Sequence, residues 1–526
     1  MLSPTRHPSL CALLTGLLLI LCFPHAQLTL LGWVALTPLV ATLTIPRSRL
    51  RCFWLGYLAG LVFFAGTCAW IYDVMRIYGH LPALAAAGVL VLFVVAFALF
   101  LGFFSLLMGE LARRWQILAL VLAPFLWVAA EWLRTYIFFG GFPWNLLGYA
   151  VAPHIGWVQP AAYTGVYGIS FLLASGNALL AAYWLAPTRA RGFALLLAAL
   201  ALFSAQLWAW QLSPVPTTNT AVLVQTNLPQ QETFDPRWIE HNRQEIAQLE
   251  ELTRETARQP RLWRGQQSAP TLIVWPELPV SIYFHHDPAM RGQLLQLAQA
   301  TRSDFLVGII DYRPGPDGKP YVYNSAALIS SAGGFVGQYD KIHLVPFGEY
   351  LPWAGWLKFL GGMVREVSDF HPGREAAVMP VGSPRGLAPS GQGRLTVIIC
   401  YEAIFPGLVR TAVARGAEVV VNISNDGWFG RSAAPAQHLN MARLRAVETR
   451  RFLLRATNTG FTAVVDPYGR IVAQAKPYER TALVAGFDFS RQQSFYARNG
   501  DWFPALCALV TVAACARKFW LEAVEA

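Results

Sequence analysis

The chain has 526 residues, of which 55% are hydrophobic and only 13% are charged. This composition excludes an ordinary soluble protein. The apolar residues are concentrated in positions 1–212 and about 502–520, whereas 213–500 has the composition of a normal globular domain. The formal net charge of +11 does not by itself imply a nucleic-acid partner, because the positions of the basic residues offer another explanation.

Eight segments are apolar enough to cross a bilayer, which takes about 20 residues in a helix. They lie near 8–24, 27–45, 52–74, 82–108, 116–137, 156–186, 192–212 and 502–520. The sixth is long enough to include an interfacial piece. We interpret the first as a membrane anchor and not a signal peptide, because Phe23-Pro24-His25-Ala26 is a poor cleavage site and a second span follows at once.

The short loops predict the orientation, because basic residues concentrate in cytoplasmic loops. Basic residues flank spans one, two, four, six and eight at the same side: Arg6, Arg47, Arg49, Arg51, Arg113, Arg114, Arg189, Arg191, Arg517 and Lys518. The loops on the other side hold little beyond Arg76 and Arg134. Both termini are therefore expected in the cytoplasm and residues 213–500 outside. This topology explains much of the positive charge, so no nucleic-acid partner is expected.

Three parts follow: a transmembrane bundle of seven spans over 1–212, an outer domain over 213–500, and an eighth helix with a cytoplasmic tail over 501–526. In the outer domain, β-branched runs alternate with helical segments, which favours an α/β layered fold. Strands are predicted at Thr220–Gln225, Thr271–Trp275, Phe305–Ile310, Ser325–Ser330, Arg394–Cys400, Glu418–Ile423, Phe461–Val465 and Ala482–Phe487, and helices at 236–258, 287–302, 406–415 and 435–457. Strands without an intervening helix in 305–340 and 461–487 predict a mixed sheet.

Chemically useful side chains follow three of these strand ends, where functional residues of α/β sheets gather. Glu277 follows Val274-Trp275-Pro276, and Lys341 and Glu349 lie in the segment from Tyr339 to Glu349. Cys400 ends an apolar run and precedes Tyr401 and Glu402. It is the one cysteine of seven outside the hydrophobic segments, so it has no partner for a disulfide within the outer domain.

These side chains form a coherent chemical set. A thiol with a usual pKa of about 8.5 is mostly protonated at neutral pH, so a nucleophilic cysteine needs a nearby base. Glu277 is the candidate base, and the Lys341 ammonium can stabilise a thiolate and then an oxyanion.

Each residue also has a simpler interpretation. Glu277 is compatible with a turn, Lys341 with a solvated charge and Cys400 with packing, and spacing alone does not show that they meet. A cysteine–histidine pair would need His343 or His438 beside Cys400, which nothing in the spacing favours. The run His285-His286-Asp287 is more typical of a turn than of a metal site.

The ordered motifs Trp-Pro-Glu, Tyr-Asp-Lys-x-His-Leu-Val-Pro-Phe-Gly-Glu and Cys-Tyr-Glu resemble the carbon–nitrogen hydrolase (nitrilase) superfamily. Together with the spans and the motif from Asn422 to Phe429, they resemble the apolipoprotein N-acyltransferase family over essentially the whole chain. The resemblance implies an α-β-β-α sandwich on a membrane bundle. It further implies that Glu277 is the general base, Lys341 the oxyanion-stabilising lysine and Cys400 the nucleophile.

The resemblance extends to residues around this triad. Glu349 matches the family's second essential glutamate, and Tyr401 and Glu402 match the residues that support the nucleophile. Phe234 stands where the family often has a tryptophan, so an indole N–H is lost there. Trp428 lies in a further family motif and is expected to face lipid.

The implied reaction has two steps. The cysteine takes an acyl chain from a phospholipid, typically phosphatidylethanolamine, as a thioester. The acyl chain then passes to the free α-amino group of an N-terminal diacylglyceryl-cysteine on a lipoprotein. The resemblance implies a bacterial inner-membrane enzyme with its catalytic domain on the periplasmic side, expected to be a monomer, and to need no cofactor or metal.

Further segments suit a lipid substrate. The apolar stretch 350–363, with Trp353 and Trp356, is expected to be a membrane-dipping arm, although a core helix is the alternative. Residues 138–145, between spans five and six, either wall the acyl pocket or anchor the bundle. Five arginines in 440–455 predict a solvated or salt-bridged face, of which one or two meet lipid phosphates: Arg443, Arg445, Arg450, Arg451 and Arg455.

Two other functions stay open from sequence alone. A membrane-tethered amidase or nitrile hydrolase would use the same triad with water as the second nucleophile. A transporter with a ligand-binding outer domain would place ionisable residues within its spans. These spans hold few such residues, with Glu131 the clearest.

Overall fold

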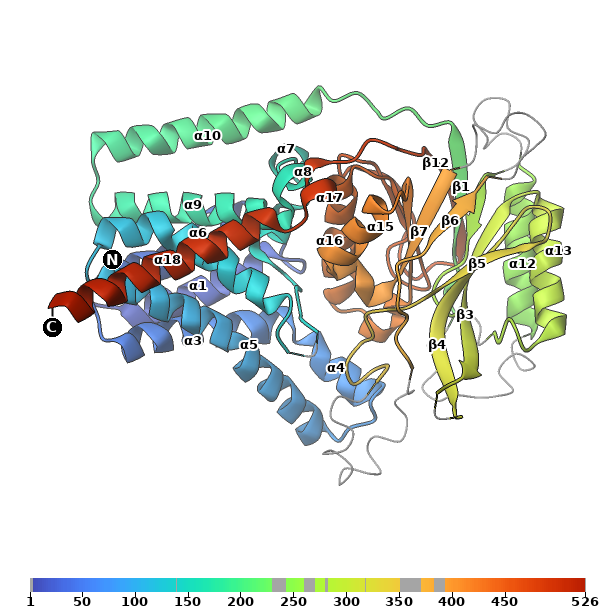
Figure 1. Ribbon diagram of the computed structural model, residues 1–526, viewed down its shortest axis with the longest axis horizontal. Helices are drawn as coiled ribbons and strands as arrows, with labels where there is room; N and C mark the ends of the chain where they lie inside the picture. The colour runs from blue at the N-terminus through green and yellow to red at the C-terminus, as the bar shows by residue number, and fades with distance from the viewer. Residues whose placement is uncertain are drawn as a thin grey trace.

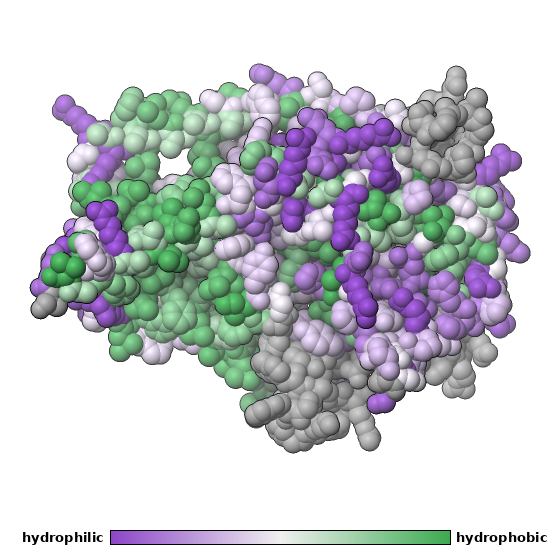
Figure 2. All heavy atoms as spheres, viewed as in Figure 1, coloured by the Kyte–Doolittle hydropathy of each residue, from purple (hydrophilic) through white to green (hydrophobic). Residues whose placement is uncertain are grey.

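The computed structural model describes residues 3–138, 140–228, 243–259, 270–279, 282–316, 318–350, 370–382 and 393–525. They form a helical bundle at one end and a layered α/β domain at the other (Figure 1). The bundle surface is mainly hydrophobic, whereas hydrophilic residues dominate the α/β domain (Figure 2). This contrast agrees with a membrane-embedded part and a part exposed to water.

The bundle combines long helices with short connecting turns. Its elements are α1 (Pro8–Cys22), η1 (Thr29–Trp33), α2 (Thr37–Thr44), α3 (Arg49–Thr67), α4 (Trp70–Ile77), α5 (Ala83–Ala112), α6 (Gln116–Arg134), η2 (Leu147–Val151), α7 (Ile155–Val158), α8 (Ala161–Thr164), α9 (Val166–Leu185), α10 (Arg189–Trp210) and α18 (Trp502–Glu525). Within the described residues, six helices are long and apolar enough to span a membrane: α3, α5, α6, α9, α10 and α18. The first two of the eight predicted spans coincide with shorter apolar helices, Pro8–Cys22 and Thr29–Thr44.

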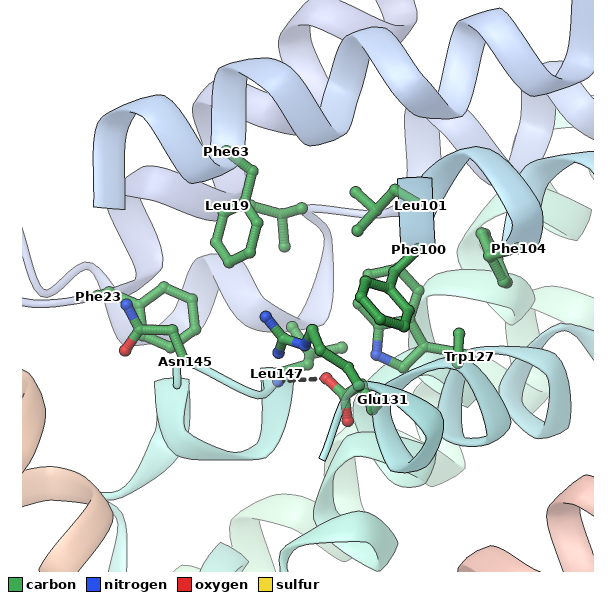
Figure 3. A pocket seen from close by; sticks show the side chains of 12 residues that line it. Leu19, Phe23, Phe63, Phe100, Leu101, Phe104, Trp127, Glu131, Asn145 and Leu147 are labelled. Carbon is green, nitrogen blue, oxygen red and sulfur yellow. Dashed lines mark hydrogen bonds between the residues drawn. The ribbon is translucent and has the colours of Figure 1, made fainter. Parts of the chain in front are cut away.

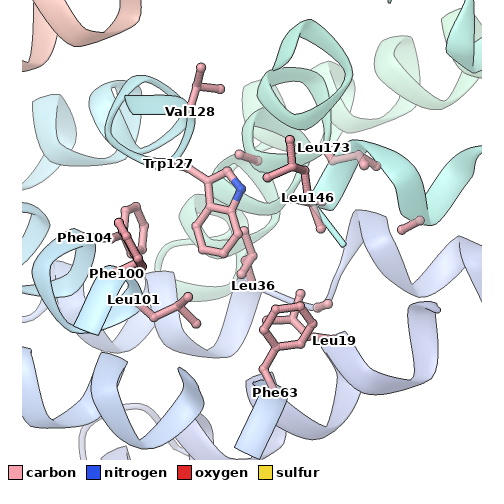
Figure 4. Close-up of a cluster of buried hydrophobic side chains, with 14 of the residues drawn as sticks. Leu19, Leu36, Phe63, Phe100, Leu101, Phe104, Trp127, Val128, Leu146 and Leu173 are labelled. Atoms are coloured by element: carbon pink, nitrogen blue, oxygen red, sulfur yellow. The ribbon is translucent and has the colours of Figure 1, made fainter. Parts of the chain in front are cut away.

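The bundle core is built from large apolar side chains of several helices. Leu19 of α1, Phe63 of α3, Phe100 of α5 and Trp127 of α6 meet in its centre (Figure 4). The same hydrophobic cluster continues into the α/β domain, through Tyr401, Ile404, Phe405, Met441, Leu444 and Val447. The two parts therefore share one apolar core and are held together by burial of apolar surface.

The described residues of the α/β domain form two six-stranded mixed sheets, with strand orders β12-β1-β2-β3-β4-β5 and β11-β10-β9-β8-β7-β6. The strands of the first sheet are β1 (Asn219–Gln225), β2 (Leu272–Val274), β3 (Asp304–Pro314), β4 (Pro320–Ile329), β5 (Phe335–Asp340) and β12 (Thr481–Phe487). Those of the second are β6 (Val378–Val381), β7 (Gly393–Ile399), β8 (Val419–Ser424), β9 (Leu453–Thr457), β10 (Ala463–Val465) and β11 (Ile471–Gln474). The mixed sheet predicted from the sequence is confirmed.

Helices cover the outer face of each sheet, as the resemblance implied. They are α12 (Arg243–Ala257) and α13 (Pro288–Thr301) on the first sheet, and α15 (Pro406–Ala414) and α16 (Ala434–Thr449) on the second, with the short η5 (Cys400–Ile404), η6 (Asp426–Phe429) and α17 (Phe495–Asn499) nearby. Both helices of the second pair lie between the sheets and the bundle (Figure 1). The domain is therefore an α-β-β-α sandwich whose second helical layer rests on the bundle.

Alternating side chains explain why both faces of the strands are buried. On β7, Leu395, Val397 and Ile399 lie in the core between the sheets, whereas Ile398 lies in the core under α15 and α16. Successive side chains of a strand point to opposite faces, so a strand covered on both sides is apolar throughout.

One predicted element is wrong in part. The helix expected over 435–457 ends at Thr449, and Leu453–Thr457 form β9, which pairs with β8 in parallel and β10 antiparallel. Arg450 has a left-handed φ of 55°, a conformation that ends helices. Tertiary pairing overrides the helix-forming composition of this segment.

Candidate active site

Glu277 and Lys341 meet because their strands end at the same edge of the first sheet. Glu277 lies three residues after β2, and Lys341 directly follows β5. β3 is parallel to β2, and β5 runs in the same direction because it pairs antiparallel with β4, which pairs antiparallel with β3. The carboxyl ends of β2 and β5 therefore share an edge, where side chains from distant parts of the sequence converge.

The Lys341 ammonium lies between two carboxylates. Its Nζ donates to Glu277 Oε1 at 3.2 Å and to Glu349 Oε1 at 2.7 Å, and its side chain is only 1% exposed. Burial by itself would lower the pKa of Lys341, but the adjacent Glu277 and Glu349 carboxylates raise it above its usual value. The lysine therefore stays a fixed positive charge inside the domain.

Glu277 is held by groups from both sheets. Asn324 of β4 donates its amide to Oε1 at 2.8 Å, and the backbone N–H of Asn425, after β8, donates to Oε2 at 2.8 Å. The same Asn324 amide donates to Glu349 Oε1 at 2.8 Å. Sequence reasoning missed Asn324, because nothing distinguishes an asparagine in a strand from any other until its neighbours are known. Asn425 lies within the family motif from Asn422 to Phe429, but the contact of its backbone N–H with Glu277 was not foreseen.

Cys400 lies at a sharp turn where β7 changes into η5. Its φ of 51° is left-handed, which is strained for a residue with a side chain. It is nearly buried, and burial raises the pKa of the thiol, as does the Glu277 carboxylate, while Lys341 acts in the opposite direction. Cys400, Glu277 and Lys341 thus lie close enough to influence one another electrostatically, and the resting thiol is protonated.

Glu402 fastens the turn of Cys400 to the loop of Lys341. Its Oε2 accepts from the Ile399 N–H at 2.7 Å, and its Oε1 accepts from the Tyr339 hydroxyl at 2.7 Å and the Ile342 N–H at 2.6 Å. Burial raises the pKa of Glu402 to about 7, against the hydrogen bonds that favour its ionised form. Ile342 follows Lys341 and Ile399 precedes Cys400, so this carboxylate sets the distance between lysine and cysteine.

The bundle contributes a loop that lies directly against this turn. The Tyr401 hydroxyl donates to the Gly141 carbonyl at 3.2 Å, and Trp144 Nε1 donates to Gln437 Oε1 of α16 at 2.7 Å. The Trp144 ring lies against Phe142 and Phe429, with centroids 5.9 and 5.8 Å away. The described part of segment 138–145 therefore lies against the turn of Cys400 and joins the bundle to the α/β domain, whereas a role in walling an acyl pocket stays a prediction.

Of the residues expected to face lipid, Trp428 is described and the others are not. Trp428 is 41% exposed and packs edge-on against Tyr78, just beyond α4, at 5.1 Å. Phe234, Trp353 and Trp356 lie outside the described residues. An exposed tryptophan at the junction with the bundle is typical of a membrane interface.

Of the two alternatives for the arginines in 440–455, a solvated face is wrong for four of them, whereas a salt-bridged face is confirmed for Arg445 and Arg455. Arg443, Arg445, Arg451 and Arg455 are all buried, two of them in ion pairs. Arg445 Nη2 donates to Glu448 Oε1 at 2.9 Å, and Arg455 Nη2 to Asp426 Oδ2 at 2.7 Å. These four guanidinium groups are buried and do not meet lipid phosphates. Arg450 is only partly buried and donates to the Gln159 side chain and the Pro467 carbonyl. The His285–Asp287 segment is a structural turn, because Asp287 caps α13 by accepting from the Met290 N–H at 3.0 Å.

A separate cavity of about 20 Å³ lies within the bundle (Figure 3). Apolar side chains such as Leu19, Phe63 and Phe100 line it together with Glu131 and Arg134. Glu131 Oε1 accepts from the Leu147 N–H at 2.6 Å, so this carboxylate holds the loop after α6. The cavity has room for a water molecule and is far too small for a transported solute.

Similarity to known proteins first defines the class of the outer domain. The family described as carbon-nitrogen hydrolase matches residues 223–497, which run from within β1 into α17. This class accounts for the sandwich but not for the bundle. The amidase from Nesterenkonia sp. overlaps 55% of this chain and 95% of its own at 21% identity, with a TM-score of 0.37, too low to carry an argument.

The bundle identifies the particular family. Residues 15–179 match the apolipoprotein N-acyltransferase N-terminal domain. Proteins named apolipoprotein N-acyltransferase from Geobacter metallireducens and Methylococcus capsulatus are each 35% identical to this chain. The matches cover 98% and 97% of this chain and 96% of each relative. The chain belongs to the apolipoprotein N-acyltransferase family, and the family resemblance found in the sequence is confirmed.

Proposed function

We propose that this protein transfers an acyl chain from a phospholipid to the α-amino group of the N-terminal diacylglyceryl-cysteine of a lipoprotein, through a thioester on Cys400. The observation that carries the proposal is the Lys341 ammonium held between Glu277 and Glu349 beside a buried, strained cysteine. Phosphatidylethanolamine is the expected donor, and the enzyme is expected to act as a monomer.

In the first step, Glu277 takes the proton of the Cys400 thiol as the sulfur attacks the ester carbonyl of the phospholipid. The carbonyl oxygen becomes an oxyanion, which the Lys341 ammonium stabilises. The ester C–O bond then breaks, and the proton on Glu277 passes to the departing glycerol oxygen. The products are a lysophospholipid and an acyl-cysteine thioester.

In the second step, the α-amino group of the lipoprotein attacks the thioester carbonyl. Glu277 accepts a proton from the nitrogen, the C–S bond breaks, and the proton returns to the sulfur. An α-amino group has a usual pKa of about 7.7–8.0, so a carboxylate suffices as the base. The covalent intermediate predicts ping-pong kinetics.

The raised pKa of the Cys400 thiol supports a mechanism in which a base removes the thiol proton during the attack on the ester. A thiol that is protonated at rest is protected from oxidation and becomes nucleophilic only when Glu277 removes its proton. Glu349 is proposed to keep Lys341 in place, because it accepts the shorter of the two lysine hydrogen bonds.

The proposal includes the arrangement in the bacterial inner membrane. Both termini lie at the end of the bundle remote from the sandwich, which supports cytoplasmic termini and a periplasmic catalytic domain (Figure 1). Near the C-terminal end of α5, Glu110 pairs with Arg49, Arg113 and Lys518, and such a cluster of basic residues is expected at a cytoplasmic face. The proposed parts of the chain are the seven-span bundle over 1–212, the catalytic domain over 213–500, and the eighth helix with its tail over 501–526. Trp428, with Phe234, Trp353 and Trp356, is proposed to contact lipid.

An amidase with water as second nucleophile remains the main rival, and the fate of the acyl chain separates the two functions. We would incubate the purified protein with phospholipid that carries a radiolabelled acyl chain and with a diacylglyceryl-cysteine peptide. The proposal predicts label in amide linkage to the peptide. Label released as free fatty acid in the presence of the peptide would contradict it.

A further inference from the structure

A buried histidine lies directly behind the proposed nucleophile. His438 of α16 is fully buried, and its Nε2 lies 3.0 Å from the backbone carbonyl oxygen of Cys400. Its Nδ1 lies 3.0 Å from Asp426 Oδ1 and 3.1 Å from Arg455 Nη2. The proposed acyl-transfer chemistry does not use any of these three side chains.

The partners of His438 determine where its proton is. A carbonyl oxygen only accepts hydrogen bonds, so Nε2 must carry a proton and donate it to Cys400. Nδ1 either donates to Asp426 or accepts from Arg455, and Nε2–H remains a donor in both cases. Neither ring nitrogen is directed at the Cys400 sulfur by these contacts, which argues against His438 as the base of a cysteine–histidine pair.

Aromatic rings and ion pairs fix the imidazole in this position. The Trp144 ring of the bundle loop stacks on it at 5.8 Å, and Phe429 packs edge-on at 6.0 Å. Arg455 Nη2 donates to Asp426 Oδ2 at 2.7 Å from the central strand β9. Burial opposes ionisation of Asp426, but Arg455 and His438 together hold the pKa of its carboxyl well below its usual range. Asp426 is therefore an anion that orients the His438 ring and the Arg455 guanidinium beside it.

The hydrogen bond to Cys400 controls the direction of the next peptide group. In a trans peptide, the C=O of one residue and the N–H of the next point to opposite sides. The Cys400 side chain belongs to the core between the sheets, whereas α16 packs on the other face of the second sheet. A carbonyl held toward α16 consequently directs the Tyr401 N–H toward the side of Glu277 and Lys341.

We propose that His438 is a positioning residue for acyl transfer: its Nε2–H holds the Cys400 carbonyl so that the Tyr401 N–H serves, with Lys341, as a donor to the oxyanion. This inference rests on the proposed function. The left-handed φ of Cys400 makes the support necessary, because a strained peptide persists only when its surroundings hold it. Asp426 and Arg455 act through His438 by keeping its ring in place.

Two substitutions at His438 separate positioning from simple packing. In His438→Ala the donor is lost, so we expect acylation of Cys400 by phospholipid to slow by about 100-fold, the usual effect of losing one oxyanion donor, with KM for phospholipid unchanged. In His438→Gln, the side-chain amide N–H can reach the place of Nε2–H, and its oxygen can accept from Arg455. We therefore expect His438→Gln to recover most of the rate.

The measurement is the rate of acyl adduct formation on the Cys400 peptide by mass spectrometry, in the full-length protein mixed with phosphatidylethanolamine. Alkylation of Cys400 by iodoacetamide is followed in parallel, because it needs an accessible thiol but no oxyanion. We expect alkylation of His438→Ala to stay near the wild-type rate. His154→Ala is the matched control. It also removes an imidazole that has a hydrogen bond, to Thr29, and that stacks on an indole, but this histidine lies in the bundle.

Three results would overturn the inference. They are acylation of His438→Ala at the wild-type rate, a parallel loss of acylation and alkylation, and a His438→Gln protein no faster than His438→Ala. Absence of any adduct on wild-type Cys400 would instead contradict the proposed function itself, so the two failures are distinguishable.

Discussion

Two regions of this molecule bury ionisable side chains, and only one of them combines a thiol, carboxylates and an ammonium group. At the strand ends, Lys341 joins Glu277 and Glu349, and further donors come from both sheets. In the bundle, Glu131 accepts from the Leu147 N–H beside a cavity of about 20 Å³. A buried ionisable group alone therefore does not indicate catalysis. At the proposed site, by contrast, a thiol, a carboxylate and an ammonium group come together from separate strands.

The largest difference between the two regions should appear when the proposed base is removed. Glu277→Gln should slow acylation of Cys400 by about 10²–10⁴-fold, the range for a general base. It should also lower the pKa of the Cys400 thiol, because the Glu277 carboxylate raises it. The pH profile of iodoacetamide alkylation would thus move to lower pH while acyl transfer is lost. An unchanged profile would show that Glu277 does not interact with the thiol.

Lys341→Met is the next largest expected effect. Loss of the ammonium should slow acylation by about 100–1,000-fold, because the oxyanion loses its cationic donor. Since Lys341 lowers the pKa of Cys400, this substitution should move the alkylation profile to higher pH, opposite to Glu277→Gln. Shifts in the same direction for both variants would contradict the proposed roles.

Glu402→Gln tests the carboxylate that joins the lysine loop to the cysteine turn. The glutamine amide group cannot accept as Glu402 does from Ile399 on one side and from Tyr339 and Ile342 on the other. We expect acylation to fall on the order of 10–100-fold, because small displacements of reacting groups have effects of this size. Binding of phospholipid should change little. A variant whose only defect is weaker lipid binding would argue against a positioning role.

The smallest catalytic effect is expected in the bundle. Glu131→Gln keeps an oxygen that can accept from Leu147, so acyl transfer should stay close to the wild-type rate. Oε2 of Glu131 is buried without a hydrogen-bond partner among the described residues, so the glutamine NH2 would be an unsatisfied buried donor there. The stability of the protein in detergent should therefore fall by about 1–3 kcal/mol, a difference measurable by thermal unfolding. A large loss of acyl transfer in a stably folded Glu131→Gln protein would mean that the bundle takes part in the chemistry.

Much of the sandwich was predictable, because its strands are short apolar runs bounded by helices, and all eight strands expected from the sequence are present. Strand β9 was not predicted, because Arg451 and Arg455 give this segment a helix-like composition. The buried hydrogen bond of Arg451 and the ion pair of Arg455 exist only in the folded domain. Glu277, Lys341 and Cys400 could be named as candidates from their positions after strands and from family motifs. The contacts of Asn324 and His438 could not be predicted, because their partners are distant in the sequence. The partners of Asn324 are 25 and 47 residues away, and those of His438 are 12 to 38 residues away.

The most direct test of the central claim is mass spectrometry of the intact protein after incubation with phospholipid alone. The proposed mechanism predicts a hydroxylamine-sensitive acyl adduct that maps to Cys400 and disappears on addition of a diacylglyceryl-cysteine peptide. Under conditions that support turnover, absence of this adduct, or an adduct on another residue, would contradict a thioester on Cys400.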